Sequence, residues 1–219
     1  MICLFDIDGT LIAAHGAGRR AFERALLDVF GMEEGLGSIQ LDGKTDPMIL
    51  DEAFLAIGRG PASEAEREQM FASYLAHLPV ELDRGHYEVL PGVERALAHF
   101  EARGAAIGLA TGNLEGGARH KLLRSDLWRR FAFGGYGSDA HAREDLVRVG
   151  IERGRKHARL GVEAEVWVIG DTPRDIAAAH AAGARAVGVA TGSYDTAALA
   201  SAGADLVAAT LDEWIDRLG

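Results

Sequence analysis

The sequence predicts an α/β fold, in which a parallel β-sheet forms the core and a helical domain is inserted near the N-terminus. The first observation is a series of short, uninterrupted apolar runs, at residues 2–5, 105–110, 166–169 and 186–190. Such runs are typical of strands in a parallel sheet, because helices cover both faces of that sheet. The second observation is the helical patterning between these apolar runs. The third is a long segment near the N-terminus that contains no such apolar run.

Helices are predicted where apolar residues recur at spacings of three and four, over residues 93–102, 146–160 and 176–182. These helices would connect successive strands along the outside of the sheet. Pro91 with Gly92, and Thr172 with Pro173, fit helix starts.

The segment from residue 15 to residue 83 carries helical patterns over 19–30, 48–57 and 65–77, with no strand pattern between them. We therefore predict an inserted helical domain at 15–83 and a sheet-containing core formed by 1–14 and 84–219. Ser63 and Glu66 have the spacing of a capping box at the start of the last of these helices.

Composition narrows the function classes. The 219 residues are 48% hydrophobic, as in a globular protein, and 33 acidic against 23 basic residues give a formal charge of −10. This charge argues against nucleic acid or an anionic membrane as the partner. The single Cys3 excludes a disulfide scaffold and a zinc site of several thiolates. Without a signal-peptide pattern or a membrane-spanning run, we expect a cytoplasmic protein. As its oligomeric state we expect a monomer or a homodimer.

Polar residues follow three of the predicted strands directly. They are Asp6 and Asp8, the run Thr111-Gly112-Asn113, and Asp171 with Asp175. Any one group would also fit ordinary helix capping or a turn. All three, however, would meet at the carboxyl edge of a parallel sheet, where ligands bind. Carboxylates at this position need a cation, a proton or hydrogen bonds, and a divalent metal would satisfy them best.

Three motifs resemble those of the haloacid dehalogenase-like hydrolase superfamily, and more narrowly its phosphatases that resemble phosphoglycolate phosphatase. The first motif is similar to Asp6-Ile7-Asp8-Gly9-Thr10-Leu11, the second to Ala110-Thr111-Gly112-Asn113, and the fourth to Gly170-Asp171 with Asp175. The resemblance covers most of the chain. It implies a Rossmann-like core and a C1-type cap inserted after the first motif.

The resemblance also implies roles for these residues. Asp6 would be the nucleophile that forms an aspartyl-phosphate, and Asp8 the general acid and then the general base. Family dehalogenases generally lack an Asp at the position of Asp8, which favours a phosphoryl substrate. The ligands of a Mg²⁺ cofactor would be Asp6, the carbonyl of Asp8, and Asp171. The phosphoryl oxygens would be bound by Thr111, Gly112 and Asn113.

The third motif departs from the family pattern, because no Lys-Pro dipeptide occurs between Thr111 and Asp171. Arg143 stands where the basic residue of this motif would fall, and its guanidinium suits phosphate. Lys121 is the competing candidate, but a lysine on a helix is usually a solvated charge, so we favour Arg143. Asp175 would hold this cation or a metal-bound water; otherwise it is a carboxylate at the first turn of a helix.

The predicted cap contains Asp42-Gly43-Lys44-Thr45-Asp46-Pro47 just before a helix. Lys44 and Thr45 are candidates for substrate contact, since functional residues favour loops on rigid scaffolds. Alternatively, Thr45 or Asp46 simply caps that helix. His15 and Arg19 are weaker candidates.

The sequence therefore predicts a Mg²⁺-dependent phosphatase that acts on a small phosphorylated metabolite. One alternative is a phosphomutase resembling β-phosphoglucomutase, which shares the first-motif carboxylates. Another is a non-catalytic phosphate-binding protein on the same scaffold.

Overall fold

A computed structural model describes residues 1–218 of the chain. Its main sheet has six parallel strands in the order β5-β4-β1-β6-β7-β8. They are β1 (Ile2–Phe5), β4 (Ala106–Thr111), β5 (Gly134–Tyr136), β6 (Val166–Gly170), β7 (Arg185–Val189) and β8 (Leu206–Ala208). The predicted fold class and the four predicted strands are confirmed, and no strand end differs by more than one residue. The short edge strands β5 and β8 were not predicted.

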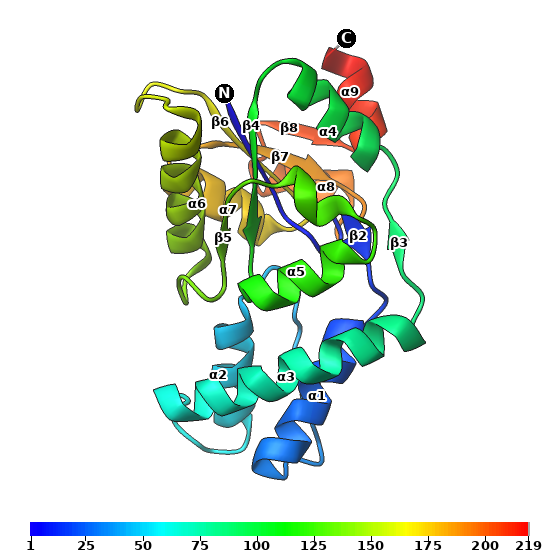
Figure 1. The fold of residues 1–219 in the computed structure, drawn as a ribbon, viewed down its shortest axis with the longest axis vertical. Coiled ribbons are helices and arrows are strands. Elements are labelled where there is room, and N and C mark those ends of the chain that lie inside the picture. Colours follow the sequence, from blue (N-terminus) through cyan, green and yellow to red (C-terminus); the bar gives the residue numbers. More distant parts are fainter. Residues whose placement is uncertain (219) are drawn as a thin grey trace.

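Helices cover both faces of this sheet (Figure 1). Alternate residues of β1 point to opposite sides, as the period of a strand requires. Cys3 and Phe5 pack in a cluster with residues of α4 (Val93–Ala102) and α9 (Leu211–Leu218), whereas Ile2 and Leu4 pack with residues of α6 (Arg143–Ala158), α7 (Pro173–Ala181) and α8 (Thr196–Ser201). This burial on both faces explains the uninterrupted apolar runs.

Helices α6 and α7 begin three residues before their predicted starts. The reason is that their first turns are polar and carry no apolar periodicity. Thr172 forms a capping box with Asp175, and Pro173 occupies the first turn of α7. The polar first turns therefore bring Arg143 and Asp175 into regular structure.

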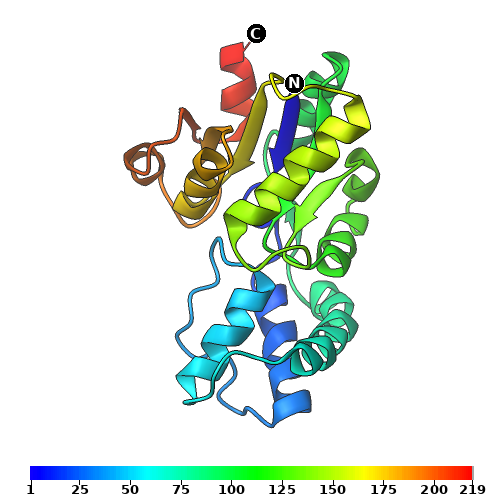
Figure 2. The same cartoon turned by 90° about the vertical axis from the view of Figure 1, so that its left-hand side faces the viewer.

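Three helices lie together at the carboxyl edge of the sheet (Figures 1 and 2). They are α1 (Ala17–Phe30), α2 (Asp46–Ala56) and α3 (Glu64–Arg84). Residues 15–83 contain no strand, and the predicted capping box of Ser63 and Glu66 is present. The predicted end of the last helix at residue 77 is wrong, because α3 continues through Pro79 to Arg84.

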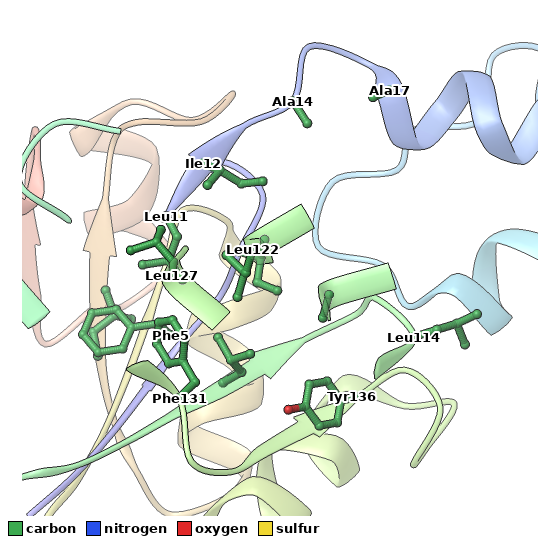
Figure 3. Packing of buried hydrophobic residues seen from close by; sticks show 14 of the residues in the cluster. Phe5, Leu11, Ile12, Ala14, Ala17, Leu114, Leu122, Leu127, Phe131 and Tyr136 are labelled. Atoms are coloured by element: carbon green, nitrogen blue, oxygen red, sulfur yellow. The ribbon is translucent and has the colours of Figure 1, made fainter. Parts of the chain in front are cut away.

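Two chain segments connect the sheet to these three helices, and they pair as a small antiparallel sheet. It joins β2 (Ile12–Ala13) to β3 (Glu88–Val89). The apolar cluster that contains Phe5 and Leu122 continues through Ala14 to Ala17 on α1 (Figure 3). Packing is thus continuous between sheet and helices, and the proposed boundaries of core and cap remain a prediction.

The carboxyl end of β4 leads into α5 (Glu115–Leu123), and the short 3₁₀ helix η1 (Leu127–Arg130) follows α5 and contacts it. Helix α5 contacts α3, so it lies between the sheet and the three inserted helices. Within residues 1–218, no helix has the length and apolar character needed to cross a membrane.

Candidate active site

Asp6 and Asp8 leave the carboxyl end of β1 in different environments. The backbone N–H of Asp6 still donates to the carbonyl of Ile169 on β6 at 2.9 Å, and the Asp6 side chain is buried. The side chain of Asp8 is 44% exposed and lies in contact with Lys121. The two carboxylates are therefore near one another in sequence but are held by different partners.

Asp6, Asp171 and Asp175 form a buried acidic cluster. Each can offer an oxygen such that all three oxygens lie within 4.8 Å of one another. Burial raises the pKa of Asp6 to about 6 although Arg143 opposes the shift, and burial followed by the charge of Asp175 raises the pKa of Asp171 well above its ordinary value. Both shifts show that negative charge in this cluster lacks full compensation by protein groups.

The cluster fits a Mg²⁺ ion by the chemistry of its donors. Carboxylate oxygens are the ligands that Mg²⁺ prefers, and it commonly needs only one or two of them beside water. Space around Asp171 is kept open by glycine: a Cβ atom on Gly9 or Gly192 would lie 2.3 or 1.8 Å from Asp171 Oδ2. The hydroxyl of Thr10 donates to Asp171 Oδ1 at 3.1 Å and so orients it.

Arg143 lies between two of these carboxylates. At the start of α6, it is buried, its Nε donates to Asp175 Oδ1 at 2.8 Å, and an Nη atom lies 3.0 Å from Asp6 Oδ2. The same guanidinium donates to the carbonyl of Gly43, in the segment before α2, at 3.3 Å. Asp175 also accepts from the N–H and hydroxyl of Thr172. The structure thus places Arg143 beside the predicted nucleophile and against Asp175.

Lys121 is not the solvated surface lysine that its position on a helix suggested. It is 4% exposed, and its Nζ donates to Asp8 Oδ2 and to Asn113 Oδ1, both at 2.6 Å. Helix α5 lies between the core and α3, and Gly18 on α1 is close enough that an added Cβ would meet Lys121 Nζ at 3.5 Å. The structure therefore brings both candidate cations into the site, each on a different carboxylate.

The loop after β4 joins this arrangement through its side chains. Asn113 Nδ2 donates to Asp8 Oδ2 at 2.8 Å and to Thr111 Oγ1 at 2.7 Å. Asp8 Oδ2 therefore accepts hydrogen bonds from both Lys121 and Asn113. Gly112 instead contacts the inserted helices: its carbonyl accepts from the N–H of Asp46 at 2.8 Å.

The predicted cap contacts are only partly at the site. Lys44 lines the cavity described below, but its Nζ pairs with Glu52. Thr45 is fully buried, caps α2 by accepting from the N–H of Met48, and donates to the carbonyl of His141 at 2.8 Å. Its hydroxyl thus serves the capping role that the sequence left open.

Asp46 is a site residue that sequence reasoning treated only as a possible helix cap. Its Oδ2 accepts from the N–H of Leu114 at 2.8 Å, and burial raises its pKa to about 6. Together with its backbone bond to Gly112, this contact fastens the start of α2 to the loop after β4. Only the position of Asp46 beside Lys44 and Thr45 could have signalled it.

These residues surround one cavity of about 530 Å³ between the sheet edge and the inserted helices. Most of the predicted site residues line it: Asp6, Asp8, Lys44, Thr111, Gly112, Asn113, Arg143 and Asp171. Thr45 and Asp175 are buried and do not line it. The inserted helices add Arg19, Phe22 and Tyr74 to the lining, of which only Arg19 was considered from the sequence. The cavity is therefore polar at the sheet edge and mixed on the opposite side.

Comparison with known proteins identifies the family. The model of the haloacid dehalogenase-like hydrolase family matches residues 1–183. A phosphoglycolate phosphatase of Rhodospirillum rubrum is 30% identical, with 99% of this chain and 94% of that protein covered. A hydrolase from Pseudomonas syringae has a similar structure, with a TM-score of 0.76, 20% identity, and 99% of this chain and 97% of that chain covered. So does a protein from Thermotoga maritima whose structure is provisionally described as that of a β-phosphoglucomutase, with a TM-score of 0.63, 20% identity, and 100% of this chain and 98% of that chain covered. The chain belongs to the haloacid dehalogenase-like hydrolase family, as its motifs predicted.

Proposed function

We propose that this protein is a Mg²⁺-dependent phosphatase that hydrolyses a small phosphomonoester through an aspartyl-phosphate. The observation that carries the proposal is the separation of two carboxylates at one strand end. Asp6 lies in a buried acidic cluster beside Arg143, whereas Asp8 lines the cavity and accepts hydrogen bonds from Lys121 and Asn113. A nucleophile and a proton carrier need such different environments.

In the first step, an oxygen of Asp6 attacks phosphorus and the bond from phosphorus to the ester oxygen breaks. Asp8 gives its proton to that departing oxygen. In the second step, Asp8 takes a proton from water as the water oxygen attacks phosphorus, and the bond to Asp6 breaks to release inorganic phosphate. The two steps together therefore return Asp6 and Asp8 to their starting states, and water is the only co-reactant needed.

The surroundings of Asp8 suit this role. The hydrogen bonds found in the described part of the chain all reach Oδ2, from Lys121 and Asn113. This arrangement holds Oδ2 in place, and Oδ1 accepts no hydrogen bond from the described residues, so we assign Oδ1 to proton transfer. We therefore assign Lys121 to the positioning of Asp8 and Arg143 to the phosphoryl group, next to Asp6.

The remaining charge needs are met at the acidic cluster and the loop after β4. When bound by Asp6, the carbonyl of Asp8, and Asp171, Mg²⁺ would offset the repulsion between an anionic nucleophile and an anionic phosphoryl group. Thr111 would offer its hydroxyl, and Gly112 and Asn113 their backbone N–H groups, to the phosphoryl oxygens. Donors that are fixed before the reaction stabilise charge as it develops.

The cavity sets the size of the substrate. A volume of about 530 Å³ under the inserted helices suits a small metabolite rather than a polymer. The relative from Rhodospirillum rubrum is described as a phosphoglycolate phosphatase, which makes phosphoglycolate the first substrate to test. A phosphomutase shares the same fold, so only the fate of the phosphoryl group separates the two activities.

The test is phosphate release from a panel of small phosphomonoesters, namely phosphoglycolate, sugar phosphates and nucleotides, with Mg²⁺ and then with EDTA. We expect Mg²⁺-dependent release from at least one member, and its loss with EDTA, because the buried carboxylates need the cation. Sugar phosphates are also examined for movement of the phosphoryl group within the sugar. Isomerisation without phosphate release would favour the mutase. If neither reaction occurred, a non-catalytic phosphate-binding protein would be favoured.

Closure of the inserted helices over the cavity gives a second expectation. A Cβ atom on Gly112 would lie 2.0 Å from the carbonyl oxygen of Lys44, which is a clash with backbone. Gly112→Ala should push the segment before α2 away from the site and lower kcat/KM about 100-fold, since small displacements at a reacting centre are costly. Steady-state kinetics on the best substrate of the panel measures this.

The matched control is Gly60→Ala, where an added Cβ meets nothing within 4 Å. Gly60→Ala should leave kcat/KM unchanged. Equal activity of Gly112→Ala and wild type would contradict the closed arrangement of Lys44 against the loop after β4.

A further inference from the structure

A second group of metal-binding side chains lies outside the acidic cluster, where the chain passes between sheet and inserted helices. It consists of His15, His86 and Glu88, which we call the linker cluster. His15 Nε2 lies 3.0 Å from Glu88 Oε1, and His86 Nε2 lies 3.7 Å from the same oxygen. The three ligand atoms all fall within 4.8 Å of one another. The two imidazole rings are 4.8 Å apart between centroids.

These distances are close to those of a tetrahedral metal site. Two ligands at about 2.1 Å from one zinc ion lie about 3.4 Å apart when the geometry is tetrahedral. The measured 3.0 and 3.7 Å lie on either side of that value. Two imidazoles and a carboxylate are also a common donor set for zinc with one position left to water. The exposure of all three residues leaves room for that water.

The electrostatic surroundings leave Glu88 available for a cation. Arg20 on α1 donates to the backbone carbonyl of His15 at 2.9 Å. Its Nε donates to Glu81 Oε2, also at 2.9 Å, so this arginine pairs with the buried Glu81, as Arg24 and Arg84 do, and not with Glu88. Glu88 therefore has only the two histidines as its side-chain partners among the described residues.

The linker cluster differs from the other exposed pairs of histidine and carboxylate in residues 1–218. His180 with Asp205, His77 with Asp28, and His141 with Asp51 each bring a single imidazole to a carboxylate. Two imidazoles meet on one carboxylate only at the linker cluster within the part of the chain that the structure describes. His180 with Asp205 has a distance of 3.0 Å and therefore provides a matched comparison.

The position of the linker cluster gives such a site a consequence. His15 follows β2, while His86 and Glu88 come from the returning segment that forms β3. A metal held by all three would connect both segments that join the inserted helices to the sheet. His15 also lines the cavity of the candidate active site.

We propose that the linker cluster binds one divalent cation of the zinc class, through the two imidazoles and the carboxylate, and that this ion ties the two connecting segments together. Nitrogen donors select Zn²⁺, Ni²⁺ or Cu²⁺ over Mg²⁺. The acidic cluster at Asp6, with oxygen donors only, has the opposite preference. The two metals would therefore occupy different sites of the same molecule.

The experiment is a calorimetric titration of the full chain with ZnCl₂ in a buffer that contains excess Mg²⁺, which keeps the oxygen-ligated site occupied. We expect one zinc-binding event in the wild type. His86→Ala should weaken its affinity at least tenfold, and His15→Asn, which suits the left-handed backbone at His15 (φ 42°), should do the same. His180→Ala should bind zinc as the wild type does.

The ligands are identified with Cu²⁺ as a spectroscopic probe. Electron paramagnetic resonance should show coupling to imidazole nitrogens in the wild type and in His180→Ala, and weaker coupling in His86→Ala. Absence of zinc binding in the presence of Mg²⁺ would overturn the proposal. Equal binding by His86→Ala and His180→Ala would overturn it as well. Neither measurement uses activity, so both outcomes are independent of the proposed phosphatase.

Discussion

Asp6→Asn should abolish turnover of every substrate in the panel, with kcat lower by on the order of 10⁴-fold or more. The amide nitrogen and oxygen of Asn are poor nucleophiles toward phosphorus, and Asp175, the other carboxylate on Arg143, does not line the cavity and so cannot replace Asp6. The change keeps the size and shape of the side chain. Single-turnover and steady-state phosphate release measure the loss.

The fold should survive this substitution, because ionised Asp6 is costly where it lies. Its pKa is raised from 3.8 to about 6, first of all by burial, so the folded protein holds the proton more tightly than the unfolded chain. The wild type without metal therefore loses stability as pH rises from 3.8 through about 6. Asp6→Asn lacks this contribution, and its thermal midpoint in EDTA at neutral pH should be no lower than that of the wild type. Retained activity would remove Asp6 as the nucleophile.

Asp8→Ala is the informative comparison, because the two carboxylates act at different stages. With 4-nitrophenyl phosphate the leaving group needs little help from an acid, so Asp6 should still be phosphorylated in Asp8→Ala. Without a base to activate water, the phosphoryl group should then remain on the protein. Asp8→Ala should release one equivalent of nitrophenol per site and then stop. Asp6→Asn should release no such burst of nitrophenol. A burst in Asp6→Asn would contradict the assigned roles.

The parts of the site that follow strands directly could be predicted from the sequence. The apolar runs locate the strands, parallel strands end at one edge, and so Asp6 and Asp171 had to lie near each other. The polar first turns of α6 and α7 carry no periodic signal, yet Arg143 was placed by its position relative to the motifs. The first two inferences depend on local sequence and sheet topology, whereas the placement of Arg143 depends on the resemblance to the family's motifs.

Other contacts depend on how the inserted helices pack, which no local pattern reveals. Lys121 has the sequence context of a surface lysine, and it is buried only because α1 and α3 cover α5. Asp46 and Tyr74 reach the cavity for the same reason. The linker cluster joins His15 to residues far along the chain, and only the pairing of β2 with β3 brings them together.

Arg143→Met should destabilise the protein by about 3–5 kcal/mol in the absence of metal, because it removes the cation from between two buried carboxylates. Asp6 and Asp175 would be left facing one another without the guanidinium that now contacts both. Activity should fall as well, since the same group is proposed to bind the phosphoryl oxygens. Urea unfolding in EDTA measures the stability, and phosphate release with Mg²⁺ measures the activity.

The pH dependence of this effect identifies its cause. Arg143 lowers the pKa of Asp6, so its removal should raise that pKa further above the unfolded value of 3.8. A raised carboxyl pKa means stability that is present at low pH and lost as pH rises. The deficit of Arg143→Met relative to wild type should therefore shrink between pH 8 and pH 5, as the carboxyl groups take up protons. A deficit that does not change with pH would instead indicate lost packing of the side chain.

Lys121→Met provides the contrast, because it removes a buried cation whose carboxylate partner can reach water. Asp8 is 44% exposed, against 7% for the side chain of Asp6, so solvent can take over much of the lost interaction. We expect a smaller loss of stability than in Arg143→Met, together with a clear loss of kcat, because Asp8 would no longer be held in place. If Lys121→Met proved the more destabilising of the two, Arg143 would not be the residue that balances the acidic cluster, and the division of roles between the two cations would be reversed.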